Sequence, residues 1–185
     1  MIERRAVLKA GIGLGLGLTI EGRAAGGQGE GASARPKEGD LLIKVGDSGG
    51  TPLTPADIAI GTRPTMAWAM DPGDRLVRSG SRLNQLLLLR FDPQALSAET
   101  RGRAADGVVA YTSICTHTGC DVDGWHADEQ QLECECHFSI FDPKDGGKPV
   151  DGPAPRALPA LPLKVVDGRL VVAKPFVTPV GFEKG

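Results

Sequence analysis

The side chains of this sequence that can do metal or redox chemistry lie in two short stretches. Residues 115–120 read C-T-H-T-G-C and residues 134–139 read C-E-C-H-F-S, and together they hold all four cysteines and two of the three histidines. Thiolates and neutral imidazoles bind zinc, iron and iron–sulfur centres. The two stretches can therefore supply two thiolates and two imidazoles to a metal centre, while two cysteines remain that can close a disulfide.

The spacing of these residues argues against the commoner metal sites. Cys115 and His117 are two residues apart, and Cys134 and His137 are three apart, so each loop can direct one thiolate and one imidazole at a common point. Structural zinc sites usually place like ligands together, as C-x2-C and H-x3-H. A zinc-stapled binding module without redox function is the alternative from a different class. The third histidine, His126, is expected to be a surface residue.

The two stretches resemble the cluster loops of the Rieske protein family, whose pattern is C-x-H-x-G-C followed by C-x-C-H-x-S. The resemblance implies one [2Fe–2S] cluster per chain, with two thiolates on one iron and two imidazoles on the other. It implies the ligands Cys115, His117, Cys134 and His137 and a disulfide between Cys120 and Cys136. The extra cysteine pair is similar to the respiratory branch, which includes cytochrome bc-type and arsenite-oxidase-type proteins.

The mixed ligand set has a consequence for the reduction potential. Two thiolates and two neutral imidazoles neutralise the formal charge of a diferric core with two sulfides, whereas four thiolates would leave a dianion. An electron enters a neutral centre more easily, and Rieske potentials accordingly lie at about −150 to +300 mV, against about −400 mV for plant-type four-cysteine centres. Such a site accepts electrons from a moderate reductant.

Four further residues are expected to tune the cluster. Ser139 can donate a hydrogen bond to a bridging sulfide. Bc-type proteins carry a tyrosine two residues after this serine, and its hydroxyl bonds to a ligating sulfur, but this chain has Phe141 there. Hydrogen bonds to the sulfurs stabilise the reduced cluster, so the loss of one should lower the potential. Gly152 and Pro153 begin a G-P-A-P stretch, residues 152–155, that resembles the proline loop of bc-type subunits.

Details of the second stretch are most similar to the small subunit of arsenite oxidase. They include residues 136–142 (C-H-F-S-I-F-D) and residues 145–147 (D-G-G). We expect an exported electron-transfer protein that serves a larger redox subunit holding a molybdopterin and passes single electrons to a cytochrome c or a cupredoxin. The alternative is a quinol-oxidising subunit of a cytochrome bc complex. No nucleophile or general-base pair is evident, so the chain alone is not expected to be a catalyst.

The region around the two stretches is acidic. Seven acidic residues and no lysine or arginine lie between residues 115 and 142. They are Asp121, Asp123, Asp128, Glu129, Glu133, Glu135 and Asp142. Negative charge here should disfavour the extra electron and attract a cationic partner. A solvated acidic loop without a special partner is the alternative.

The N-terminus has the features of a targeting segment. Arg4 and Arg5 precede an apolar, glycine-rich run from residue 10 to residue 20, and Ala24 and Ala25 offer a cleavage site. This pattern resembles a twin-arginine signal, which implies a periplasmic location where a disulfide persists. We expect the signal over residues 1–25 and a flexible linker over residues 26–40. Membrane association is expected only through an uncleaved signal.

Composition indicates one all-β domain over residues 41–185. Glycine (26) and proline (14) are abundant among the 185 residues, long amphipathic helical patterns are missing, and the net charge of −2 argues against nucleic-acid binding. Strands are expected at residues 41–45, 65–70, 86–90 and 107–112, and a hairpin around Asp167-Gly168. The resemblance implies a Rieske-type antiparallel β-sandwich whose cluster-binding subdomain is formed by the loops at residues 115–120 and 134–142.

Overall fold

A computed structural model describes residues 27–182 of the chain. The expected twin-arginine signal at residues 1–25 lies outside the described residues. Across residues 27–182, no helix is both long and apolar enough to cross a membrane. Strands and loops make up most of the described chain, and every strand pairing is antiparallel except one isolated bridge between Ile60 and Arg90.

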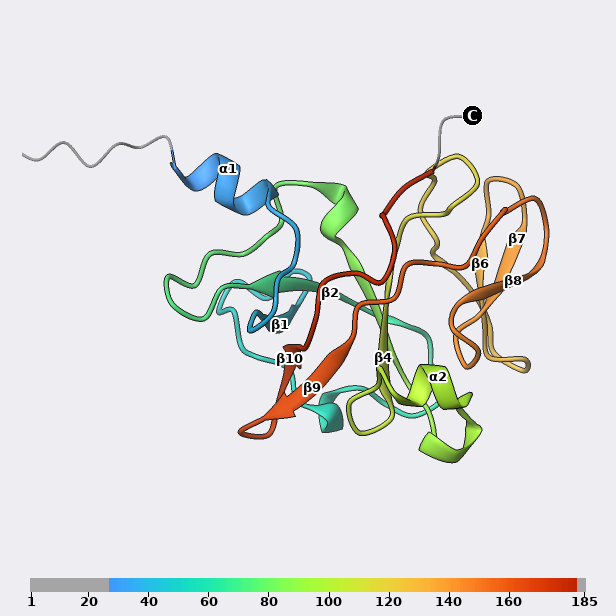
Figure 1. Ribbon diagram of the computed structural model, residues 1–185, viewed down its shortest axis with the longest axis horizontal. Helices are drawn as coiled ribbons and strands as arrows, with labels where there is room; N and C mark the ends of the chain where they lie inside the picture. Colours follow the sequence, from blue (N-terminus) through green and yellow to red (C-terminus); the bar gives the residue numbers. More distant parts are fainter. Residues whose placement is uncertain (1–26, 183–185) are drawn as a thin grey trace, which may run out of the picture.

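Six strands form the larger sheet, in the order β4-β3-β2-β1-β10-β9 (Figure 1). They are β1 (Leu41–Lys44), β2 (Thr65–Met70), β3 (Leu86–Arg90), β4 (Val108–Thr112), β9 (Leu163–Val166) and β10 (Arg169–Val172). The strands β9 and β10 are joined by the turn at Asp167-Gly168, where both residues have a positive φ. This is the geometry that an Asp-Gly pair favours in a two-residue hairpin loop.

Four shorter strands form a second sheet, in the order β5-β6-β7-β8. They are β5 (Gly124–His126), β6 (Gln131–Cys134), β7 (Ser139–Asp142) and β8 (Lys148–Asp151). Each strand is connected to the next by a hairpin, and the pairing of β7 with β8 shifts its register between Ile140 and Phe141. We call this sheet with the loop at residues 113–123 the cluster tip, and the six-stranded sheet the base.

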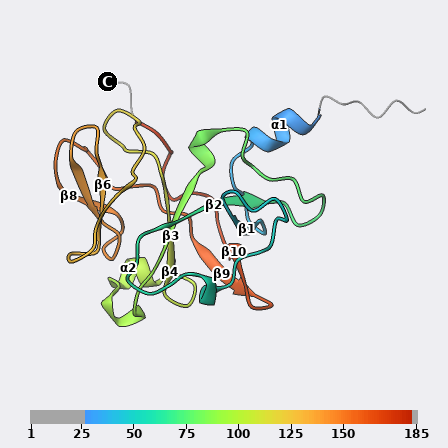
Figure 2. The ribbon, with the colours of Figure 1, turned by 180° about the vertical axis from the view of Figure 1, so that it is seen from behind.

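Strands β4 and β3 form one edge of the base sheet, and this edge is the part of the sheet nearest to the tip in both views of the molecule (Figures 1 and 2). Side chains alternate in direction along a strand. One face of each of these two strands therefore packs in the core of the base, and the other face packs in the core beneath the tip. Leu86 and Leu88 belong to the apolar core of the base, whereas Leu87 and Leu89 belong to a second core beneath the tip. The run of four leucines, where the sequence predicted a strand, is therefore a strand buried on both faces.

Within residues 27–182, helical structure is limited to short pieces at the ends of loops. They are α1 (Gly27–Ser33), α2 (Ala98–Arg101) and the 3-10 turns η1 (Pro55–Asp57), η2 (Arg82–Asn84) and η3 (Pro93–Ala95). In η3 the carboxylate of Asp92 accepts a hydrogen bond from the amide of Gln94, and proline follows at the first helical position. Both features favour a helix start, and they account for the short helical turn at this position.

Residues 27–40 differ from the flexible linker that we expected. Arg35 donates to the carbonyl of Leu83, and the side-chain amide of Asn84 donates to the carbonyl of Ala34. Asp40 is fully buried and forms an ion pair with Arg78. The polar composition suggested a solvated segment, but its polar groups find partners on the loop that follows β2, so the segment packs on the domain.

The expected all-β antiparallel fold is confirmed, and all the strands predicted in the base are present. The three strands β5, β7 and β8 of the tip were not identified from the sequence. They contain three or four residues each, and glycine, proline and charged residues are frequent in and around them. Such segments lack the β-branched and aromatic runs by which strands are recognised.

Candidate metal centre

The first cluster loop leaves β4 and closes on itself within a few residues. The amide of Cys115 donates to the carbonyl of Cys120 at 2.8 Å, and the amide of Gly119 donates back to the carbonyl of Cys115 at 3.1 Å. Gly119 has a φ of +82°, a left-handed conformation that glycine adopts without strain. The glycine of the C-x-H-x-G-C pattern thus allows the loop to bring its first and last cysteines together.

The second cluster loop is the turn of the hairpin between β6 and β7. Cys134 and Ser139 are opposite each other in the ladder, and the amide of Phe138 donates to the carbonyl of Cys134 at 2.9 Å. Phe138 has a φ of +58° although it carries a side chain, and it is 67% exposed. The strand pairing therefore holds the four intervening residues in a fixed, partly strained turn at the surface of the tip.

A disulfide joins the two loops. Cys120 and Cys136 are bonded, with their Cα atoms 6.5 Å apart and 16 residues apart in the sequence. This is the pairing that the resemblance implied. The sulfurs of this disulfide and of Cys134 all lie within 4.8 Å of one another. Because bonded sulfurs are not available as thiolates, this group of three does not form a metal site by itself, and it places the disulfide directly beside Cys134.

The two remaining cysteines lie side by side under the loops. Cys115 and Cys134 are free, 1% and 2% exposed, and contribute to the same apolar core. Burial raises the pKa of the Cys134 thiol to about 11, and a hydrogen bond with the Cys115 side chain acts in the same direction. A raised pKa favours the protonated thiol. A bound metal cation reverses this, because a thiol that coordinates a metal is deprotonated. Backbone hydrogen bonds from Cys136 and His137 favour the Cys134 thiolate, and two adjacent buried thiols fit two ligands of one iron.

The two histidines of the motifs also meet. The ring centroids of His117 and His137 are 4.6 Å apart, in an edge-to-face arrangement. The Nδ1 atom of His117 is buried and has no hydrogen-bond partner among the described residues. An unpaired polar atom in a buried place is costly, and a metal ion would satisfy it. His137 is exposed, so its ring is also accessible to a partner at the surface of the tip.

Two of the expected tuning residues, Ser139 and Phe141, are buried near the cysteine pair. Ser139 is fully buried, and its hydroxyl accepts a hydrogen bond from the amide of Ala154 in the proline loop. Phe141 is also fully buried and shares the apolar core of Cys115 and Cys134. A Cβ atom at Gly152 would lie 2.5 Å from the Cα of Ser139, so this glycine allows the proline loop to approach the second cluster loop.

The acidic surface of the tip has more partners than the sequence indicated. Arg82 forms an ion pair with Asp121 at 2.7 Å and donates to the carbonyl of Gly119 at 2.9 Å. Arg82 lies 33 residues before the first cysteine of the motifs, so the charge count over residues 115–142 did not include it. His126 bonds to Glu133 at 2.6 Å, and its side chain is 39% exposed, in agreement with the expected surface position.

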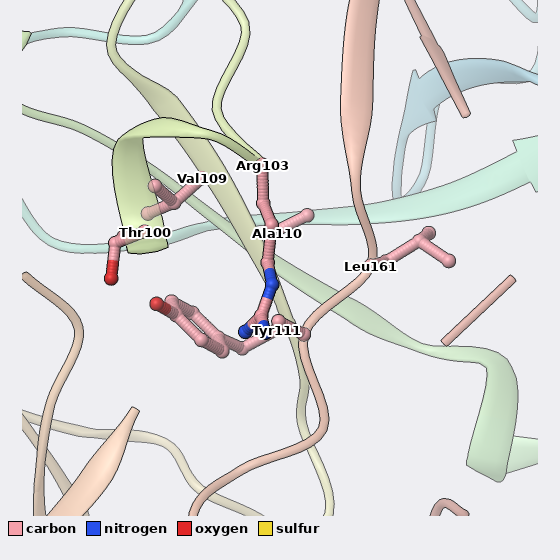
Figure 3. Close-up of a pocket in the computed structure, with 7 residues that line it drawn as sticks. Thr100, Arg103, Val109, Ala110, Tyr111 and Leu161 are labelled. Atoms are coloured by element: carbon pink, nitrogen blue, oxygen red, sulfur yellow. The ribbon is translucent and has the colours of Figure 1, made fainter. Parts of the chain in front are cut away.

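A buried tyrosine anchors the strand that leads to the first cluster loop. Tyr111 donates its hydroxyl to the carbonyl of Pro143 at 2.8 Å, and Figure 3 shows this hydroxyl directed toward Thr100. Burial raises the pKa of Tyr111 well above its usual value. The cavity beside it has a volume of about 10 Å³, enough for about one water. Tyr111 connects β4 to the hairpin that carries Phe141, and no motif in the sequence marks it.

Comparisons with known proteins agree with this arrangement. Residues 86–162 match the family model of the Rieske [2Fe-2S] domain. The cytochrome bc1 complex Rieske iron–sulfur subunit of Streptomyces lividans is 33% identical over 150 residues, which are 78% of this chain and 85% of that relative. The subunit of the same name from Streptomyces coelicolor shows the same identity, but the chain covers only 41% of its length.

Among solved structures, the soluble domain of the Rieske protein II (soxF) from Sulfolobus acidocaldarius is 26% identical, with a TM-score of 0.43. The match covers 55% of this chain and 66% of that one. The sequence match across most of a relative, the disulfide-linked loops and the paired free cysteines all agree. The chain therefore belongs to the Rieske family of iron–sulfur electron-transfer proteins, whose cofactor is a [2Fe–2S] cluster.

Proposed function

We propose that Cys115 and Cys134 hold one iron of the cluster and that His117 and His137 hold the other. The observation that carries this assignment is the convergence of two free buried thiols and two adjacent imidazoles, one of which has a buried nitrogen without a partner. When bound, the cluster supplies one-electron redox chemistry. The chain's own part is to hold these four ligands, exclude water from the thiols and expose His137 at the surface.

The first candidate for the physiological role is a quinol-oxidising subunit of a cytochrome bc complex. The names of the Streptomyces relatives, the disulfide and the proline loop support it. In this role the exposed imidazole of His137 would accept a hydrogen bond and then the proton of the quinol. The partners would be the cytochrome subunits of that complex. This candidate was the alternative in our sequence analysis.

The second candidate is the small subunit of an arsenite-oxidase-like oxidoreductase. It would take electrons from a larger subunit holding a molybdopterin and pass them to a cytochrome c or a cupredoxin. Phe141 favours this role, because it is buried within the same core as the cysteines and offers no hydroxyl to a ligating sulfur. A cluster with one hydrogen bond fewer has a lower reduction potential. Such a cluster is a weaker oxidant than the oxidation of quinol requires.

Both roles agree with export by the twin-arginine pathway to the periplasm, which we also propose. The disulfide between the cluster loops supports an oxidising compartment. The two arginines near the start of the sequence and the apolar run that follows support the route.

Chemical analysis of the purified protein tests the cluster assignment. We expect iron and acid-labile sulfide in equal amounts, a reddish-brown colour and an electron paramagnetic resonance signal after reduction. Cys134→Ser and His117→Gln should abolish all three, whereas His126→Gln, at the histidine outside the motifs, should retain them. A colourless protein that contains zinc and no sulfide would exclude the cluster and favour the zinc-stapled module.

Isolation of the native complex distinguishes the two physiological roles. A cytochrome b that co-purifies with the chain from gently solubilised membranes would support the first role. A molybdenum-containing subunit that co-purifies from the soluble exported fraction would support the second.

A further inference from the structure

The segment that follows β10 crosses the molecule and ends at the first cluster loop. Figure 1 shows it as the dark red trace that leaves β10 and reaches the yellow loop beside the tip. On its way the amide of Val177 donates to the carbonyl of Ala160 at 3.0 Å. The described part of the segment ends at Phe182. Residues 177–182, which we call the strap, therefore lie against the tip although they follow the last strand of the base.

Arg156 connects the strap to the rest of the tip. Its guanidinium donates from one nitrogen to the carbonyls of Pro179 and Gly181, at 3.0 and 2.6 Å. Its own carbonyl accepts a hydrogen bond from the hydroxyl of Thr116 at 2.7 Å. Thr116 stands between the proposed ligands Cys115 and His117. One residue thus bonds to the strap with its side chain and to the first cluster loop with its backbone.

The end of the strap covers the glycine of the first cluster loop. A Cβ atom at Gly119 would lie 2.8 Å from the Cδ1 atom of Phe182, so the aromatic ring rests directly on the glycine backbone. The carbonyl of Gly119 is held by Arg82 at 2.9 Å. The loop is therefore fixed by an arginine and covered by an aromatic ring. A glycine is needed at this position for its φ and for this contact.

We propose that the strap positions the first cluster loop, with Phe182 as its contact and Arg156 as its anchor. Both are positioning residues, because they act on His117 through Gly119 and Thr116. The consequence for redox behaviour rests on the cluster assignment proposed above, whereas the mechanical consequence for the loop does not. Without the ring, the loop should open more often and admit water to the proposed cluster site. Water stabilises the more negatively charged reduced state, so the potential should rise.

Amide hydrogen exchange on the full-length protein, followed by mass spectrometry, tests the proposal. In Phe182→Ala and in Arg156→Ala we expect residues 113–121 to exchange at least about threefold faster, because local opening costs less free energy. Residues 135–141 of the second loop should keep their rate. Phe182→Leu should restore most of the protection. Val165→Ala, at an exposed apolar residue on β9, is the matched control and should change neither loop.

The reduction potential of the same variants gives the second readout. It should rise in Phe182→Ala and return toward the starting value in Phe182→Leu, a pattern that a general loss of stability does not produce. Unchanged exchange over residues 113–121 in both alanine variants would overturn the proposal, as would equal acceleration in both loops. If the protein held no iron, the cluster assignment would fail. The exchange comparison would still show whether the strap positions the first cluster loop.

Discussion

The base and the cluster tip of this molecule are built in different ways. The core of the base consists of aliphatic side chains contributed by β1–β4, β9 and β10 and by the loops next to them. The core beneath the tip includes the two free cysteines. The strands of the tip itself contribute the buried residues Leu132, Cys134 and Phe141, and the partly buried Trp125 of β5 packs against them. The base is therefore held by apolar burial, whereas the tip is also held by the disulfide between its loops and, in the ligand assignment that we propose, by the cluster.

This difference has a physical reason in the number of side chains that each strand buries. In the base, β2, β3, β4 and β10 each bury three or more residues, whereas no strand of the tip buries more than two. One or two buried side chains per strand are too few to offset the entropy of ordering the loops between them. A disulfide and a metal centre reduce that entropy in the unfolded chain or add binding free energy to the folded one. The strands of the tip can carry exposed, strained loops because the disulfide holds them and, as we propose, the cluster ligands do so as well.

The largest expected effect is a loss of stability when a buried ion pair of the base is broken. Arg78 and Asp40 form a bidentate ion pair at 2.5 and 2.9 Å, with side chains only 4% and 0% exposed. Arg78→Leu leaves the buried Asp40 carboxylate without its partner, and we expect the free energy of unfolding to fall by about 3–5 kcal/mol. Denaturant unfolding followed by far-ultraviolet circular dichroism measures it.

The control for this variant removes both charges. In Arg78→Leu with Asp40→Leu no charge is left buried, and much of the lost stability should return. The iron content and the resonance spectrum of both variants at low temperature should match those of the parent, because the pair lies in the base. A changed spectrum would show that base and tip are more closely coupled than we describe.

The next effect concerns the tip alone. Replacing Cys120 and Cys136 by serine removes the link that closes a loop of 16 residues. The chain-entropy model gives about 3 kcal/mol for such a loop. Hydrogen exchange should accelerate across residues 115–141, while the amides of β1, β2 and β10 keep their protection at low denaturant. Uniform acceleration in both regions would contradict the division into two independently held parts.

The smallest expected effect concerns the reduction potential of the cluster in the tip. Phe141→Tyr places a hydroxyl in the core shared by Cys115 and Cys134, where it can donate to a sulfur. A hydrogen bond worth about 0.5–1.5 kcal/mol in the reduced state corresponds to an increase of roughly 20–60 mV in a one-electron potential. Redox titration measures it, with Phe91→Tyr as a control in the same core. A reduction potential that stays constant or falls would contradict the idea that the missing hydroxyl lowers the potential of this protein.

The sequence alone predicted the strands of the base and indicated the donor set that we propose. Short-range patterns predict both features. The spacing of cysteines and histidines indicates which metal centres they can bind, and an apolar run such as Leu86–Arg90 predicts a buried strand. The Asp-Gly pair similarly predicted the hairpin of β9 and β10. Each of these features depends on residues close together in the chain.

Only the tertiary structure revealed which distant groups meet at the tip. Arg82, Arg156 and Phe182 reach the first cluster loop from 33 or more residues away, and no local pattern marks them. The linker expected before residue 41 was likewise wrong in its described part, because Asp40 and Arg35 find partners on the loop after β2. Composition indicates whether a segment is polar, but its burial depends on partners that the chain brings together only when it folds.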